Sequence, residues 1–312
     1  MFHYIGRLVS FFCKKSRVET KLLPTAKIAS FFRSSQEIET LENNLIKTSK
    51  SIKFIIDPPS GYFLWKIFID IVDYDKLILI NSCEPIKLNN IQKNIIKYAD
   101  YFAKIYSSDP IILNKISHSE LFCFGTCWVL ANKKGQVNVS DTNGYIDITR
   151  KDYKNIFSNQ KTFKLSFIKS KKRLLPGHKL RHQITNIIEK KRSYELLFPQ
   201  NRIESKIPLF IDSMFHIAIE NSQETNYFTE KIIDCFISYT VPIYWGCPNI
   251  DDFFDSDGII TFSNQEELAS ILDSLTPEDY FKRLEMMNKN KRIAEDKYVF
   301  FSDRLNEIIK GI

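Results

Sequence analysis

Short apolar runs alternate with helical patterns along the first half of the chain. Residues 51–57 (SIKFIID) and 76–82 (KLILINS) are short and β-branched, which is typical of buried parallel strands. Residues 98–109 predict the end of a helix that runs into a third strand, and 122–130 is a fourth candidate strand. The polar, turn-rich segment 133–160 then interrupts this pattern and predicts a domain boundary.

The second half repeats this alternation of short apolar runs and amphipathic helices. Strands that alternate with helices form parallel sheets. We therefore expect an α/β protein with two doubly wound, Rossmann-like domains that face each other across a cleft. In such domains, ligands bind outside the carboxyl ends of the strands. The predicted strands are 163–170, 214–220, 241–246 and 258–262, and the predicted helices are 177–192, 228–239 and most of 265–312.

Composition supports a globular protein of two domains. The chain has 312 residues, of which 44% are apolar and 26% charged, and this length favours two domains over one. We place them at 1–155 and 156–312, with the last helix packing back on the first domain. Six scattered cysteines, none at a metal-binding spacing, predict free thiols in a reducing compartment.

The chain lacks the apolar segments that membrane insertion requires. No run of about 18 uncharged apolar residues occurs, so no transmembrane helix is expected. Residues 1–17 are broken by Arg7 and have no small-residue cleavage site, so they do not resemble a signal peptide. These observations predict a cytoplasmic protein. A peripheral membrane contact is the alternative for this segment, because Phe11 and Phe12 precede three cations.

Positive charge is concentrated in one segment. The formal net charge is +7, and residues 161–192 alone carry eleven Lys or Arg and one acid, which is +10 and leaves −3 for the rest. A concentrated basic segment favours a phosphate-bearing partner or an anionic membrane surface. Binding of nucleic acid would call for aromatic residues between the cations, for base stacking. The segment has only Phe163 and Phe167, both within a predicted strand, so we expect no nucleic-acid partner.

Polar residues gather around the turn between a predicted strand and the helix that follows it. Glu220, Asn221 and Ser222 come directly after the strand, and Glu230 and Lys231 begin the helix. The free N–H groups and dipole of a helix N-terminus favour an anion. Lys231 can then reach a phosphate, and Glu230 can bind sugar hydroxyls. The alternative is an ordinary solvated first turn, where glutamate is also favoured.

A second basic group lies at another strand-to-helix junction, within the sequence PGHKLRHQ. It contains His178, Lys179 and Arg181. Arg181 is the best phosphate ligand among them, because its planar guanidinium binds phosphate oxygens in a bidentate manner. A solvated basic helix face is the alternative interpretation. We expect the side chains of Arg181 and Lys231 both to leave the core.

Two carboxylates of the first half follow predicted strands. Glu84 follows 76–82 with one residue between, and Pro85 fixes the turn that presents it. A carboxylate at the carboxyl end of a strand can face the cleft and act as a general base. Asp109 is the second candidate, and its alternative role is a turn cap. We expect His118 and His216 to be satisfied by local hydrogen bonds.

The sequence around the turn resembles a known family. Residues 218–254, AIENSQETNYFTEKIIDCFISYTVPIYWGCPNIDDFF, are similar to the signature of the α1,3/α1,4-fucosyltransferases. That signature is F-E-N-S, a short spacer, Y-[VIF]-T-E-K, an amphipathic helix and V-P-[IV]-Y-W-G. Ile219 stands where the family usually has phenylalanine. Residues 164–184 look like the opening of the second domain in viral and bacterial relatives, so the chain is identified as a soluble member of that type.

This resemblance implies a GT-B fold and a fucosyltransferase activity. In the family, an inverting displacement transfers L-fucose from GDP-β-L-fucose to a hydroxyl of a glycan acceptor and forms an α-(1,3)-type fucoside. The first domain would bind the acceptor and the second the donor. The alternatives are a transferase of the same fold that uses another GDP-sugar, and a relative that binds a sugar nucleotide without catalysis.

The resemblance also assigns roles to particular residues. Glu84 matches the proposed base, and Arg181 matches the phosphate-binding arginine. No D-x-D carboxylate pair is present, so we expect no metal site and no strict cofactor requirement, although a divalent cation would be compatible as a stimulant. The donor-binding residues implied are Asn221, Tyr227, Glu230 and Lys231, and the additional candidates are Lys179, His178, Glu220, Ser222 and Asp109.

Overall fold

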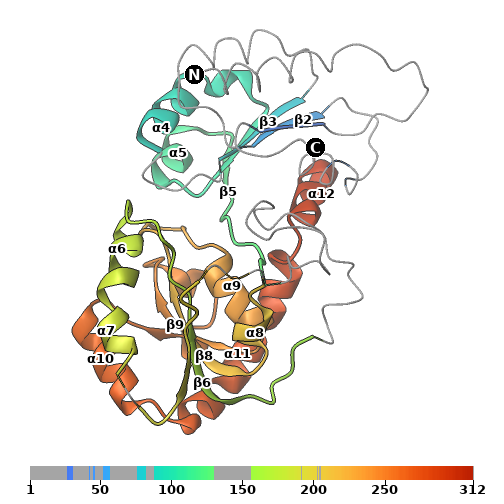
Figure 1. Ribbon diagram of the computed structural model, residues 1–312. Coiled ribbons are helices and arrows are strands. Elements are labelled where there is room, and N and C mark those ends of the chain that lie inside the picture. Colours follow the sequence, from blue (N-terminus) through green and yellow to red (C-terminus); the bar gives the residue numbers. More distant parts are fainter. Residues whose placement is uncertain are drawn as a thin grey trace.

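The computed structural model describes most of the second half of the chain and parts of the first. Glu84, the N-terminal segment 1–17 and most of the expected boundary segment lie outside the described residues. In the described part, the strands form two parallel five-stranded sheets (Figure 1). The described residues are 27–30, 42, 45, 52–56, 76–81, 88–129, 156–190, 192–201, 203 and 205–311.

The first sheet is built from strands in sequence order. Its order is β1-β2-β3-β4-β5, and every neighbouring pair is parallel. All five residues of β2 are buried, as expected for its β-branched sequence. The described elements of this first half are β1 (Lys27–Ser30), β2 (Ile52–Ile56), β3 (Lys76–Asn81), α4 (Leu88–Lys97), a 3-10 turn (Ala99–Tyr101), β4 (Lys104–Ser107), α5 (Pro110–Lys115) and β5 (Ser119–Leu121).

The fourth predicted strand of this half was placed too late in the chain. We expected it at 122–130, whereas β5 ends at Leu121 and the following residues 122–129 contain no strand. Phe122 instead packs edge-on against Phe301, with ring centroids 6.0 Å apart. The apolar residues after β5 are therefore buried by contacts outside the sheet. The pattern of apolar residues alone does not distinguish such burial from burial within a strand.

The second sheet carries helices on both faces. Its order is β10-β9-β8-β6-β7, with β8 at the centre and buried along all seven residues. Figure 1 shows α6, α7 and α10 on one side of the sheet and α8, α9 and α11 on the other. The elements are β6 (Thr162–Phe167), α6 (Pro176–Gln183), α7 (Thr185–Ile188), β7 (Glu195–Leu197), α8 (Ile207–Phe210), β8 (Ser213–Ile219), α9 (Glu230–Ile237), β9 (Val241–Trp245), 3-10 turns at Ile250–Asp252 and Ser256–Gly258, β10 (Ile260–Thr261), α10 (Gln265–Ser274), α11 (Pro277–Lys297) and α12 (Phe301–Gly311).

The predicted helix at 177–192 is two short helices. α6 ends at Gln183 and α7 begins at Thr185, with Ile184 fully buried between them. The short edge strand β7, which was not predicted, follows them. The amphipathic helix α9 agrees with expectation, because Phe228, Ile232 and Phe236 are all fully buried.

The C-terminal helix α12 packs on the first sheet, although it follows the second sheet in sequence. Figure 1 shows it extending from α11 toward β2 and β3. The Arg304 guanidinium lies 3.7 Å from the ring centroid of Phe122 and donates a hydrogen bond to the Gly125 carbonyl at 3.2 Å. Phe301, Leu305, Ile308 and Ile309 of α12 share one hydrophobic cluster with Ile52, Phe54, Ile56, Ile78, Ile80 and Phe122.

No helix among the described residues is long and apolar enough to cross a membrane. The four cysteines within the described ranges are buried and free, and burial raises the pKa of Cys123 to about 12. Cys13 and Cys83 lie outside those ranges.

His216 is buried in β8 and satisfied locally, as predicted. Its Nδ1 lies 2.8 Å from the Ser166 hydroxyl, and its ring packs on Phe210 at 4.5 Å between centroids. Burial, followed by the charges of Lys206 and Arg181, lowers the pKa of His216 to about 3. The predicted contact of His118 is also present, since its Nε2 lies 3.1 Å from the Ala99 carbonyl.

His216 should make the protein less stable in acid. Above a pH of about 6.5 the imidazole is neutral in the folded and the unfolded chain, so it adds no pH dependence to the free energy of unfolding. Below that pH the His216 imidazole is protonated in the unfolded chain but stays neutral in the folded chain down to about pH 3. The free energy of unfolding should therefore fall by about 1.4 kcal/mol per pH unit from this group. Urea unfolding from pH 7 to 4 measures this slope. Equal slopes in the wild type and His216→Gln would contradict it.

Candidate active site

Two glycines bring the carboxyl end of β8 against its neighbours. A Cβ atom on Gly177 of α6 would lie 1.7 Å from the Glu220 carbonyl oxygen, and the Gly177 N–H donates to the Asn221 carbonyl at 2.9 Å. A Cβ on Gly246, after β9, would lie 2.5 Å from Cγ of Glu220. A side chain at either position would displace Glu220. Neither glycine was predicted from the sequence to have this role.

Glu220 organises the turn from inside. Its side chain is fully buried, and its two carboxylate oxygens accept bonds from the Thr229 N–H at 2.8 Å and the Thr229 hydroxyl at 2.6 Å. Lys231 lies 3.2 Å from the same carboxylate. Glu220 thus ties the end of β8 to the start of α9. Thr229, which the sequence analysis did not propose as a site residue, is the link.

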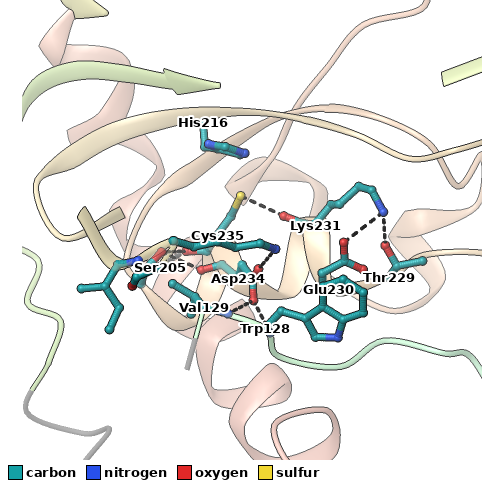
Figure 2. A network of polar contacts seen from close by, with 12 residues as sticks. Trp128, Val129, Ser205, His216, Thr229, Glu230, Lys231, Asp234 and Cys235 are labelled. Atoms are coloured by element: carbon teal, nitrogen blue, oxygen red, sulfur yellow. Dashed lines mark hydrogen bonds and ion pairs between the residues drawn. The ribbon is translucent and has the colours of Figure 1, made fainter. Parts of the chain in front are cut away.

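Lys231 is held by three oxygen atoms at the N-terminus of α9. Its Nζ lies 3.2 Å from Glu220 Oε2, 3.2 Å from Glu230 Oε1 and 2.8 Å from the Thr229 hydroxyl. Figure 2 shows Lys231 extended over α9, with Glu230 and Thr229 at its tip. The ammonium is therefore fixed in place rather than free on the surface, and its side chain keeps 18% exposure.

Glu230 is ionised throughout the neutral range. Burial by itself would raise the pKa of Glu230, but the positive charges of Lys231 and Lys206 outweigh burial and lower that pKa to about 2. A buried carboxylate that stays ionised is a strong acceptor for hydroxyl groups. The pair of Glu230 and Lys231 therefore presents one acceptor and one cation at the same helix end.

Arg181 does not leave the core, contrary to our expectation. It is 5% exposed, and its Nη2 donates to the Ile219 carbonyl and, at 3.0 Å, to Oδ1 of Asn221. The reason is the close approach of α6 to β8 that Gly177 permits. Arg181 and Asn221 are thus brought together, and the arginine orients the asparagine amide.

The remaining candidates of the second half differ in their surroundings. His178 is buried, and its Nδ1 accepts the Leu175 N–H at 3.2 Å, which caps α6. Lys179 is exposed on α6. Ser222 is buried, and its hydroxyl has no hydrogen-bond partner among the described residues, whereas Tyr227 packs in the core at 3% exposure.

Asp109 of the first half acts as a helix cap. Its Oδ1 accepts the Ile111 N–H at 2.8 Å and its Oδ2 accepts from Gln92 Nε2 at 2.6 Å. Both oxygens are therefore engaged, which matches the alternative that the sequence left open for this residue.

A buried ion pair behind the turn was not predicted. The fully buried Asp234 of α9 accepts from Lys206 Nζ at 2.7 Å and from the backbone N–H groups of Trp128 and Val129 at 2.7 and 2.8 Å. Burial would lower the pKa of Lys206, but the carboxylates of Asp234 and Glu230 raise it. This network, drawn in Figure 2, ties the segment after β5 to the helix that carries Glu230 and Lys231.

Within the described ranges, no group of three or more His, Cys, Asp or Glu side chains is placed to hold a metal ion. Two cations lie beside the turn: the partly exposed Lys231 of α9 and the buried Arg181 of α6.

The two parallel α/β sheets have the GT-B arrangement that the sequence resemblance implied. One α1,3-fucosyltransferase structure, solved with GDP-fucose, superposes with a TM-score of 0.50 at 14% identity, covering 92% of this chain and 95% of that one. A second α1,3-fucosyltransferase structure gives a TM-score of 0.51 at 14% identity, covering 89% and 85%. At this identity the similarity establishes the fold.

Residues 177–292 match the family described as glycosyltransferase family 10 (fucosyltransferase), C-terminal region. This part of the chain holds nearly all of α6 together with β8, the turn and α9, and its match confirms the resemblance predicted from the sequence.

Two curated relatives align with shorter stretches. An α-(1,3)-fucosyltransferase, FucT, from Helicobacter pylori is 30% identical over 108 residues, which is 33% of this chain and 22% of that protein. An α-(1,4)-fucosyltransferase from Arabidopsis thaliana is 38% identical over 64 residues, which is 20% of this chain and 16% of that protein. The aligned part thus spans about a fifth of either relative.

Proposed function

We propose that the protein transfers L-fucose from GDP-β-L-fucose to a hydroxyl of a glycan acceptor, with inversion, to give an α-(1,3)-type fucoside. The observation that carries this proposal is the fixed pair of Glu230 and Lys231 at the N-terminus of α9, inside the segment that matches family 10. The names of the aligned relatives and the GDP-fucose bound to a protein of the same fold support it.

In this mechanism the second domain stabilises the leaving group. Negative charge grows on the diphosphate of GDP as the bond to fucose breaks. We assign stabilisation of that charge to the Lys231 ammonium and to the N–H groups that begin α9. The ionised Glu230 accepts hydrogen bonds from sugar hydroxyls. Arg181, which is buried, contributes to donor binding indirectly, because it orients the amide of Asn221.

The first domain would bind the acceptor and supply the base. Glu84 remains our proposed base, because it follows β3 in the sequence and a carboxylate after a strand can act as a general base. It takes the proton from the acceptor hydroxyl as that oxygen attacks the fucose from the face opposite the diphosphate. Asp109 is a weaker candidate because both of its oxygens already accept hydrogen bonds. We expect no strict requirement for a metal ion, and a divalent cation would act as a stimulant only.

GDP-fucose should stabilise the protein more than other sugar nucleotides do. A ligand that binds only the folded state at 100 times its Kd adds about 2.7 kcal/mol to the free energy of unfolding. We expect a clear rise in melting temperature with GDP-fucose and a smaller one with UDP-galactose. GDP-mannose tests the alternative of another GDP-sugar. Equal shifts with GDP-fucose and UDP-galactose would refute the donor assignment.

A further inference from the structure

Asn226 connects the turn after β8 directly to the first sheet. It lies between Asn221 and Tyr227, and its Nδ2 donates to the backbone carbonyl of Ser108 at 3.3 Å, across 118 residues of sequence. Its backbone is left-handed, with φ of 63°, a conformation that asparagine tolerates better than most residues. The proposed role of the turn as donor site does not by itself require this contact.

The amide of Asn226 is oriented by a second asparagine. The Asn226 N–H donates to Asn249 Oδ1 at 2.8 Å, and Asn249 Nδ2 returns a bond to Asn226 Oδ1 at 2.9 Å. Asn249 Nδ2 also lies 2.8 Å from Asp252 Oδ2. Because the Asn226 oxygen accepts from Asn249, its NH₂ group is the end that faces Ser108.

The first sheet presents a rigid acceptor for this bond. Ser107, at the end of β4, is fully buried, and its hydroxyl accepts from Asn81 Nδ2 at 3.3 Å and from the Asp109 N–H at 3.1 Å. Asp109 in turn caps α5 and binds Gln92. The Ser108 carbonyl therefore lies between two residues that this buried polar cluster holds in place.

We propose that Asn226 is a positioning residue that fixes the turn after β8 against the carboxyl end of β4. This proposal rests on the proposed function only for the meaning of the turn as a donor site. The hydrogen bond from Asn226 to Ser108, here called the bridge, sets the separation between two parts of the site. These are the sheet edge that would carry the acceptor and the turn that would carry the donor.

Two substitutions isolate this bond. Asn226→Asp keeps the size and the oxygen that accepts from Asn249, but replaces the donor to Ser108 by an oxygen. Asn226→Gly keeps the left-handed backbone and removes the amide altogether. Asn186→Asp makes the same chemical change on the exposed surface of α7 and serves as the matched control.

Hydrogen–deuterium exchange of the ligand-free protein reports on the bridge. Loss of this partly buried hydrogen bond should speed exchange by about fivefold. We expect this change at residues 104–112 of the first sheet as well as at 222–229, in both Asn226 variants and not in Asn186→Asp. A change confined to 222–229 would mean a local structural role and would overturn the proposal, as would the same change at 104–112 in the control.

A second measurement separates positioning from donor binding. The KM for GDP-fucose in its slow hydrolysis by water should stay within about twofold of the wild type in Asn226→Gly, because Lys231 and Glu230 keep their contacts. A tenfold rise in that KM would assign Asn226 to donor binding and overturn the proposal. Absence of a wild-type melting shift with GDP-fucose would refute the proposed function, whereas the exchange experiment would still decide on the bridge.

Discussion

Replacement of Lys231 by alanine is expected to lower the rate of GDP release from GDP-fucose by at least about a hundredfold, the usual effect of losing one preorganised charge-stabilising donor. The ammonium is fixed by Glu220, Glu230 and Thr229, so it needs no reorganisation as charge develops on the diphosphate. The variant also leaves the Glu220 and Glu230 carboxylates together without their shared cation. Loss of Lys231 should therefore raise the pKa of Glu230, because that charge is a main reason for its low value.

The comparison that tests this prediction is Lys289→Ala. Lys289 pairs with Asp255 on the surface at 2.8 Å, and loss of such an exposed pair has little effect on stability. Turnover is measured by GDP release at saturating donor. A Lys231→Ala protein that is folded and turns over at the wild-type rate would remove Lys231 from the mechanism. Arg181→Ala should be equally slow, but also less stable, because it removes the buried hydrogen bonds to the Ile219 carbonyl and to Asn221.

Replacement of Lys206 by alanine is expected to destabilise the protein by about 3–5 kcal/mol, the range measured when one partner of a buried ion pair is removed. The reason is that Asp234 is fully buried and would lose the cation that lies 2.7 Å away. The Trp128 ring would also lose its cation–π contact with Lys206, whose Nζ lies 5.3 Å from the ring centroid. Chemical denaturation at neutral pH measures the loss.

A variant in which both charges are removed shows whether the lost stability comes from the ion pair or from loss of packing. Lys206→Met with Asp234→Asn removes both charges, and the Asn oxygen can still accept from the N–H groups of Trp128 and Val129. The double variant should recover most of the stability that Lys206→Met loses by itself. Lys310→Ala, at an exposed pair with Glu307, should change stability by less than about 0.5 kcal/mol. A double variant as unstable as the single one would contradict this explanation.

The sequence predicted the elements of the site better than the directions of its side chains. The strand β8, the turn and α9 follow from the switch between apolar periods, and these local signals were sufficient. The prediction that the Arg181 side chain leaves the core was wrong. Its direction depends on Gly177, which lets α6 contact β8, and this is a tertiary contact. The burial of Glu220 depends on Gly246 in the same way.

Partners far apart in sequence were not predictable for a related reason. Lys206 and Asp234 are 28 residues apart, and Asp234 is about 105 residues from the Val129 N–H that it accepts. In the sequence Asp234 looks like a polar residue of an amphipathic helix, and Lys206 like an ordinary charged residue outside the basic segment. Only the path of residues 122–129 past α9 places both charges in a buried position.

The packing of α12 on β2 and β3 has a consequence for synthesis of the chain. Domains usually fold in order as they leave the ribosome. Here the first sheet leaves it well before α12, whose Phe301 and Leu305 complete the cluster around Phe54 and Ile78. Until then, the apolar face of that sheet is without its cover. The first-made sheet should thus finish folding after the second and depend on chaperones in the interval.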